Sequence, residues 1–263
     1  MQRQRFTAGV NGWSRLVPHR SCSRHRPLLV YVPLHAFSMT QVDPPGATLP
    51  PLDEQTRCLV RLAAVIGAGS ERQMRALLVE ARSLPASWVE EVILQSYLFA
   101  GFPRTLNAAR EWRRISGRPA PASDADSDVT LPGTADGWRT RGDVTCAHVY
   151  GDMYDKLRVN IAKLHPALDH WMITDGYGKV LSRAGLDIVR RELCVIAVCA
   201  LAEQDRQLHS HFHGALNVGA TPAQVSGTLD ALADLIEEDS LRRYRMLWGH
   251  VRTAHTEQAQ GLS

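Results

Sequence analysis

The chain has 263 residues, of which 44% are hydrophobic and 22% charged, so it can bury a sizeable core as one large domain or two small ones. No apolar stretch approaches the roughly 18 residues of a membrane span, and we expect no transmembrane helix and no membrane partner. The net charge of +3 depends on the first 42 residues, which hold six arginines and no acidic residue. The mildly acidic remainder argues against nucleic-acid binding.

Residues 1–50 form a leader of unusual composition. It is arginine-rich and acid-free, as organellar transit peptides are, and its stretch PLLVYVPLHAF resembles the apolar part of a signal peptide. Pro27, Pro33 and His35 interrupt that stretch, and no small-residue cleavage site follows it. We favour a disordered or wrongly assigned leader, with translation starting at Met39, over a transit peptide.

An internal repeat follows the leader. Residues 57–81 align with residues 191–215 and share several identities, which indicates two copies of one helical unit, although helical sequences also produce such sparse matches by chance. The matched pairs are Arg57 with Arg191, Leu59 with Leu193, Ala63 with Ala197, Arg72 with Arg206, Gln73 with Gln207, Ala81 with Ala215 and, after a two-residue shift, Val89 with Val225. We expect a degenerate first domain at residues 51–117 and a second domain at residues 138–256.

Two segments between the copies carry glycines. Residues 118–137 consist mainly of Pro, Ala, Ser, Asp and Gly, a composition typical of a linker. Residues 176–183, GYGKVLSR, suggest a phosphate loop but lack both the GxxxxGK[ST] and the GxGxxG patterns. A tight turn between helices is the better interpretation.

The second copy is predicted to be helical throughout. Residues 193–202 are apolar on every face, which is typical of a buried central helix. The polar residues 203–207 predict a turn, and a second helix follows from about residue 206 to residue 217. No run of alternating apolar residues indicates strands, so the predicted fold class is all-α.

Local signals predict where the next helix begins. Gly219 suits the left-handed position that ends a helix. Thr221 can cap the next helix, Pro222 suits its first position, and Gln224 completes a capping box.

Glu192 and His211 are the candidate acid–base pair. If the helices around residues 193–202 and 206–217 pack as an antiparallel hairpin, the two side chains can meet. A carboxylate then fixes the imidazole tautomer and raises its basicity, as a general base near neutral pH requires. The alternatives are that Glu192 pairs with Arg190 or Arg191, and that His211 is a hydrogen-bonded core residue.

His209 and His213 suggest a metal site, because they lie four residues apart on one helix face. His211 points elsewhere, and no HExxH motif or CxxC pair supplies a third ligand. We therefore expect surface histidines and no metal.

The five cysteines, Cys22, Cys58, Cys146, Cys194 and Cys199, are odd in number and form no CxxC pair. This pattern favours a reducing, cytoplasmic location.

Residues 191–225, RELCVIAVCALAEQDRQLHSHFHGALNVGATPAQV, resemble the core of the carboxymuconolactone decarboxylase and alkyl hydroperoxidase D family. The shared motifs are REL, HxxxAL and GxTP, and the preceding VYGDMYDKL and HPALDHWMITDGYGKVLSRAGLD are similar to the decarboxylase-like branch. The resemblance covers most of residues 51–247. It implies two tandem alkyl hydroperoxidase D-like helical domains packed as a pseudo-dimer, and a homo-oligomer that is a trimer of such chains.

The resemblance also implies which chemistry is absent. The redox branch of the family uses a CxxC pair, whose positions correspond here to Gln204 and Gln207, so thiol peroxidase chemistry is disfavoured. In the first copy, the positions equivalent to Glu192, Gln204, Gln207 and His211 are Cys58, Ser70, Gln73 and Leu77. That copy keeps no acid or base and is expected to be a structural partner.

The decarboxylase branch removes CO₂ from γ-carboxymuconolactone by proton transfers and needs no thiol, metal or organic cofactor. The resemblance implies His211 as general acid and base, Glu192 as its orienting partner, and Glu203 and Gln207 as hydrogen-bonding groups. An anionic small-molecule substrate calls for a cation, for which Arg206 and Arg183 are the candidates. The alternatives are an inactive helical binding or assembly protein and, less favoured, a thiol peroxidase or disulfide reductase.

Overall fold

The computed structural model describes residues 52–124, 126–127, 130, 133–259 and 261. Its regular elements are helices, with no strand in this part of the chain, which confirms the predicted all-α class. None of these helices is both long and apolar enough to cross a membrane. The leader predicted for residues 1–50 lies outside the described residues.

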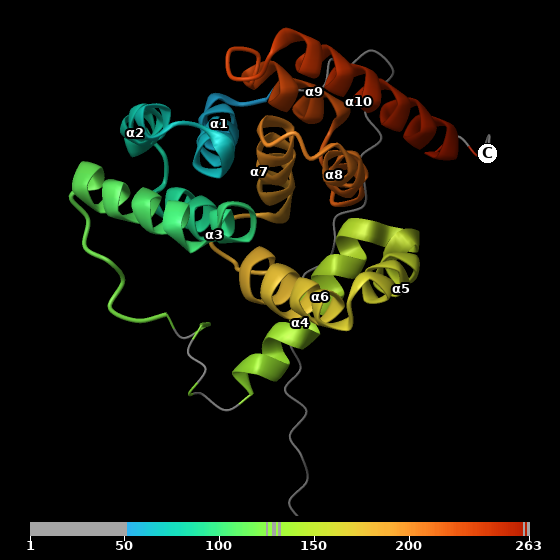
Figure 1. Cartoon of the computed structure of the whole chain (residues 1–263), viewed down its shortest axis with the longest axis horizontal. Coiled ribbons are helices and arrows are strands. Elements are labelled where there is room, and N and C mark those ends of the chain that lie inside the picture. Colours follow the sequence, from blue (N-terminus) through green and yellow to red (C-terminus); the bar gives the residue numbers. More distant parts are fainter. Residues whose placement is uncertain (1–51, 125, 128–129, 131–132, 260, 262–263) are drawn as a thin grey trace, which may run out of the picture. The chain divides into compact units, whose positions relative to one another are not determined.

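Figure 1 labels the α-helices, and three short or irregular helical segments of the described chain lie between them. They are α1 (Glu54–Ala68), α2 (Glu71–Glu80), the 3-10 helix η1 (Ala81–Ser83), α3 (Ala86–Ser116), α4 (Thr134–Tyr150), the 3-10 helix η2 (Gly151–Met153), α5 (Tyr154–Leu164), α6 (Pro166–Trp171), the π-helix η3 (Met172–Leu181), α7 (Ile188–Leu201), α8 (Asp205–Asn217), α9 (Pro222–Ala231) and α10 (Glu238–Ala259). Helix α3 is kinked at Gly101, whose φ is +68°. Helix α4 begins at Thr134, inside the segment predicted as a linker.

Helix α7 is the central helix. It packs against α1, α8, α9 and α3, and Figure 1 shows it between α1 and α8. Residues 191–200 are all buried, which confirms the predicted buried helix. Because neighbours cover every face, an apolar side chain is favoured at nearly every position.

The predicted boundaries around α8 and α9 are confirmed. Helix α8 ends at Asn217, and Gly219 adopts φ +98°, a left-handed conformation that glycine tolerates without strain. Thr221 caps α9 by accepting a hydrogen bond from the Gln224 backbone N–H, and the Gln224 side chain completes the capping box. These signals act within a few residues, which is why the sequence predicts them well.

The two halves share a local pattern. Helices α1 and α2 begin at Glu54 and Glu71, and α7 and α8 begin at Ile188 and Asp205, with the same spacing between the two starts. Asp53 caps α1 and Asp187 caps α7, each through its side chain. This agreement is what a duplicated unit requires, and the pseudo-dimer itself stays a prediction.

The prediction of a tight turn at residues 176–183 was wrong. Gly176 to Leu181 belong to the π-helix η3, and only the residues after Leu181 turn. The glycine at 178 serves a close helix crossing, because a Cβ there would lie 1.9 Å from the backbone oxygen of Trp138 in α4. On the other helix, a Cβ at Gly142 would lie 2.0 Å from the backbone oxygen of Ile173.

We therefore expect Gly178→Ala to destabilise the protein by about 1–3 kcal/mol, because backbone must move to admit the methyl group. Urea unfolding measures this loss. The matched control is Gly249→Ala in α10, where a Cβ meets no atom within 4 Å and alanine should instead stabilise the helix by about 0.5–1 kcal/mol. Equal stabilities of Gly178→Ala and the wild type would contradict the close crossing.

Candidate acid–base site

Glu192 and His211 meet across the α7–α8 hairpin. The Nδ1 atom of His211 lies 2.7 Å from Oε2 of Glu192, and the two side chains are 10% and 0% exposed. An ionised carboxylate only accepts hydrogen bonds, so Nδ1 carries the proton and Nε2 is the basic nitrogen of the neutral ring. The geometry therefore suits a histidine that takes up and releases a proton at Nε2.

The arginines beside Glu192 have other partners. Arg191 binds Glu91, with 2.8 Å between Nη2 and Oε2, and Arg190 binds Asp187, with 2.7 Å between Nη1 and Oδ2. Glu192 thus pairs with the histidine and not with either neighbouring arginine.

Gly214 makes room for the glutamate. A Cβ at this position would lie 2.9 Å from Oε2 of Glu192 and 2.7 Å from a methyl group of Val149. A larger residue at this point of α8 would displace the carboxylate from His211.

The second carboxylate oxygen of Glu192 is unpaired. Oε1 is the only buried side-chain oxygen or nitrogen of the described residues without a hydrogen-bond partner. Leaving such a group unsatisfied costs about 1–3 kcal/mol, so a donor from outside the chain would be bound favourably here. A buried acceptor without a donor calls for an explanation, such as a bound water molecule, an ion or a catalytic role.

Two tyrosines from distant elements complete the surroundings. Tyr150 ends α4 and Tyr177 lies in η3, with 6.1 Å between their ring centres. The Tyr150 ring meets the His211 ring edge-on, at 6.3 Å between centres. Burial raises the pKa of Tyr150 to about 12 and that of Tyr177 well above its ordinary value, so both phenols stay protonated near neutral pH.

Sequence reasoning missed both tyrosines. Tyr150 stands directly before Gly151, inside the quoted VYGDMYDKL, but its spacing from Glu192 carries no information about contact. Only the packing of α4 against α8 and η3 brings these rings to the histidine.

The nearby thiols are poorly suited to redox chemistry. Burial raises the pKa of Cys146, Cys194 and Cys199 to about 12 in each case, which leaves almost no thiolate near neutral pH. These cysteines and the half-buried Cys58 are all free.

The other predicted site residues lie apart from this pair. Glu203 sits in the turn before α8 with φ +57°, and Arg206 and Gln207 are on the first turns of α8. All three are exposed, and no hydrogen bond or ion pair within the described chain connects them to Glu192 or His211.

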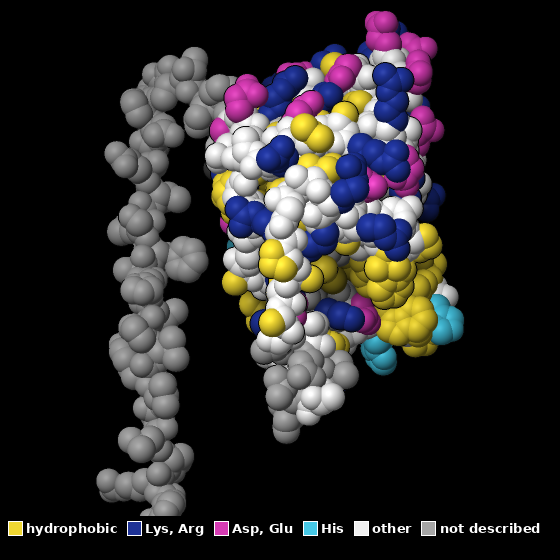
Figure 2. Space-filling view, turned by 90° about the vertical axis from the view of Figure 1, so that its left-hand side faces the viewer, with side chains coloured by type: hydrophobic (Ala, Val, Ile, Leu, Met, Phe, Trp, Pro, Cys, Tyr) yellow, Lys and Arg dark blue, Asp and Glu magenta, His cyan; other side chains and the backbone are white. Residues whose placement is uncertain are grey.

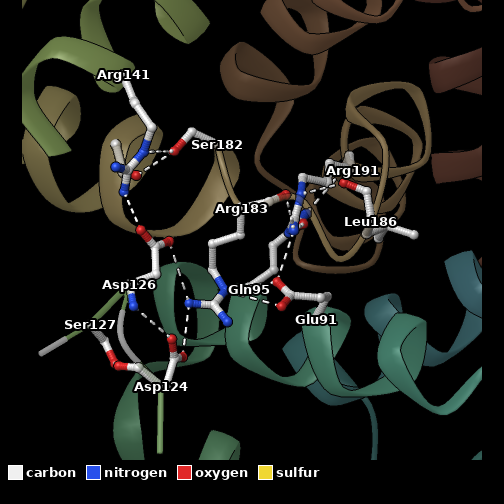
Figure 3. Close-up of polar contacts among 11 residues, drawn as sticks. Glu91, Gln95, Asp124, Asp126, Ser127, Arg141, Ser182, Arg183, Leu186 and Arg191 are labelled. Carbon is white, nitrogen blue, oxygen red and sulfur yellow. Dashed lines mark hydrogen bonds and ion pairs between the residues drawn. The ribbon is translucent and has the colours of Figure 1, made fainter. Parts of the chain in front are cut away.

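Arg183 belongs to a separate ionic network, shown in Figure 3. Its guanidinium donates to both oxygens of Glu91, at 3.1 and 3.0 Å, and pairs with Asp124 at 3.0 Å. Arg191 shares the same glutamate and is fully buried. Arg183 is thus engaged by three carboxylates, because Asp126 also lies 3.7 Å away.

The three histidines of α8 do not converge. His209 and His213 contact each other edge-on, with 5.0 Å between ring centres, while His211 is engaged with Glu192. Burial, followed by the charges of His209 and His255, lowers the pKa of His213. Among the described residues, no group of three or more His, Cys, Asp or Glu side chains is placed to hold a metal ion.

The pair lies within a segment that matches known proteins. The model of the carboxymuconolactone decarboxylase family matches residues 167–240, which include Glu192 and His211. A Schizosaccharomyces pombe (strain 972 / ATCC 24843) protein named "Peroxisomal protein 2" is 32% identical over 156 residues, covering 57% of this chain and 69% of that relative.

Proposed function

Because the chain belongs to the carboxymuconolactone decarboxylase family, we propose that it is a cofactor-free acid–base enzyme of the lyase type, acting on a small carboxylated lactone or a related compound. The observation that carries this proposal is the 2.7 Å contact between Nδ1 of His211 and Oε2 of Glu192 inside the matched segment. It leaves Nε2 available for proton transfer. The experiment is to measure CO₂ release from γ-carboxymuconolactone by the purified chain.

The roles follow from the geometry of the pair. His211 delivers a proton to the carbon that loses CO₂, and Glu192 stabilises the imidazolium that forms when the ring takes up the next proton. An anionic substrate needs a cation, and Arg206 is the better of the two candidates because it is exposed, whereas Arg183 already binds carboxylates. We also propose that Glu203 and Gln207 form hydrogen bonds with the substrate at the mouth of the site.

A binding or assembly protein of the same fold is the second candidate. The observation that favours it is the burial of the pair, since His211 retains only 10% side-chain exposure and Glu192 none. In this alternative the Glu192–His211 hydrogen bond stabilises the α7–α8 hairpin and turnover is absent.

We expect the cysteines to be dispensable for activity, because the buried thiols of Cys146, Cys194 and Cys199 stay protonated and the CxxC positions hold glutamines. Replacing all five by alanine or serine in a variant that still folds should leave the rate of lactone turnover largely unchanged. The matched control adds His211→Ala to the same background and should be inactive. Peroxide-dependent loss of thiols that turns over with a dithiol reductant would instead support the redox alternative.

We also propose that the chain is a homo-oligomer, a trimer of pseudo-dimeric chains. Exposed hydrophobic side chains support association: Phe102 is 62%, Leu164 72% and Trp171 60% exposed. Figure 2 shows hydrophobic side chains gathered at one corner of the displayed face, with histidines at the border. Light scattering of the eluting protein measures the mass directly.

The compartment is a proposal as well. The free cysteines favour a reducing environment, and the cytoplasm is our first expectation. The name of the fission-yeast relative raises the peroxisome as the alternative. Imaging of the tagged chain with markers for both compartments separates the two.

A further inference from the structure

In the proposed acid–base pair, one carboxylate oxygen of Glu192 has a hydrogen-bond partner and the other has none. Oε1 is buried without a donor, whereas Oε2 accepts from His211. Burial, followed by nearby charges that include Glu192, raises the pKa of the phenols of Tyr150 and Tyr177 and of the thiols of Cys146 and Cys199. The phenols are the stronger hydrogen-bond donors of this set, and neither donates to Oε1 in this structure.

The phenol rings of Tyr150 and Tyr177 pack against each other. Burial raises the pKa of both, because a phenolate is poorly solvated in these surroundings. Among the described residues, no carboxylate, carbonyl or histidine accepts a hydrogen bond from the Tyr150 hydroxyl.

Position also singles out Tyr150. Tyr177 is only 4% exposed, whereas Tyr150 is half-buried and packs edge-on against the His211 ring. Val149, its neighbour in α4, borders Gly214 and the Glu192 carboxylate. Tyr150 thus packs against the histidine that binds Glu192, and Oε1 of this glutamate has no hydrogen-bond donor.

We propose that Tyr150 is a further catalytic residue, whose hydroxyl donates a hydrogen bond to the carbonyl oxygen of the substrate while Oε1 of Glu192 accepts one from a hydroxyl group or water molecule bound beside it. This inference rests on the proposed function and narrows the substrate to compounds with a carbonyl conjugated to the reacting carbon. When the bond to the departing CO₂ breaks, its electron pair moves onto that carbonyl oxygen as an enolate. Tyr150 stabilises the enolate, the Nε2–H of protonated His211 protonates the carbon, and the ring regains its proton from solvent. No oxidant or reductant is required.

The test compares two tyrosine variants on γ-carboxymuconolactone. Tyr150→Phe keeps the ring against His211 and removes the hydroxyl, so kcat should fall on the order of 10²- to 10³-fold, as for the loss of one donor to a developing oxyanion, with a smaller change in KM. Tyr177→Phe is the matched control, because it removes the hydroxyl of the tyrosine that packs against Tyr150 and should cost less than about tenfold. Melting temperatures are measured for both variants.

A second readout keeps the inference testable if Tyr150→Phe folds poorly. Replacing Tyr150 by 3,5-difluorotyrosine keeps the hydroxyl and lowers the pKa of the phenol, so the alkaline limb of the kcat profile should move to lower pH. If the Tyr150 ring has only a structural role, the alkaline limb of the kcat profile should stay at the same pH.

The outcomes separate this inference from the function on which it rests. If Tyr150→Phe turns over at the wild-type rate while His211→Ala is inactive, the role of Tyr150 is overturned and the acid–base proposal stands. If the wild-type chain releases no CO₂ from this substrate, or His211→Ala keeps the wild-type rate, both are overturned.

Discussion

His211→Ala should lower the turnover of γ-carboxymuconolactone on the order of 10²- to 10⁴-fold, the usual contribution of one acid–base group. The reason is that Nε2 of His211 is the basic nitrogen left free by the 2.7 Å hydrogen bond from Nδ1 to Glu192. The rate is measured per folded molecule, with folding followed by circular dichroism and melting temperature.

The same experiment includes Glu192→Gln as a graded control. Glutamine keeps the shape and one hydrogen bond but loses the charge that supports an imidazolium, so its loss of rate should be smaller. If the two residues are only structural, both substitutions should act through stability. A melting temperature that falls while the rate per folded molecule stays constant would favour the assembly-protein alternative.

Glu91→Leu should destabilise the protein by about 3–5 kcal/mol, because it leaves the guanidinium of Arg191 charged and buried without its carboxylate partner. Arg191 is 0% exposed, and its Nη2 lies 2.8 Å from Oε2 of Glu91. Burial lowers the pKa of Arg191 and the ion pair with Glu91 raises it. Glu91 therefore stabilises the buried positive charge of Arg191. Urea unfolding gives the free energy.

Glu90→Leu is the matched control for this loss. Glu90 precedes Glu91 on α3 and pairs with Arg113, and the two side chains of this pair are 25% and 29% exposed to solvent. Such pairs contribute about 0–1 kcal/mol, so the control should lose much less stability. If the two variants lose equal free energy of unfolding, the buried pair between α3 and α7 contributes no more to stability than the partly exposed pair.

The parts of the fold that depend on nearby residues could be predicted from the sequence. The capping box of Thr221 and Gln224, the left-handed Gly219 and the all-round apolar α7 are each encoded within one or two turns. The Glu192–His211 contact also follows, because an antiparallel hairpin with a short turn leaves little freedom in how its two helices align. A family resemblance and the hairpin geometry pointed to the same two residues.

The parts that depend on distant packing could not be predicted. Glu91 is one hundred residues from Arg191 and Tyr150 ends a different helix, so no spacing rule relates them to the site. The glycine-rich residues 176–183 were misinterpreted because their need for glycine comes from α4, whose backbone touches Gly178. Arg183 was proposed for substrate binding because an anionic substrate calls for a cation. Its three carboxylate partners could not be predicted, since they lie far from it in the chain or in the segment taken as a linker.

The most direct measurement of the central claim, that Glu192 acts through His211, is a double-mutant cycle on lactone turnover with the wild type, Glu192→Gln, His211→Ala and the double variant. The predicted result is that the double variant turns over no more slowly than His211→Ala, because a carboxylate without its histidine has nothing to orient. Losses that multiply in the double variant, or equal rates in all four proteins, would contradict it.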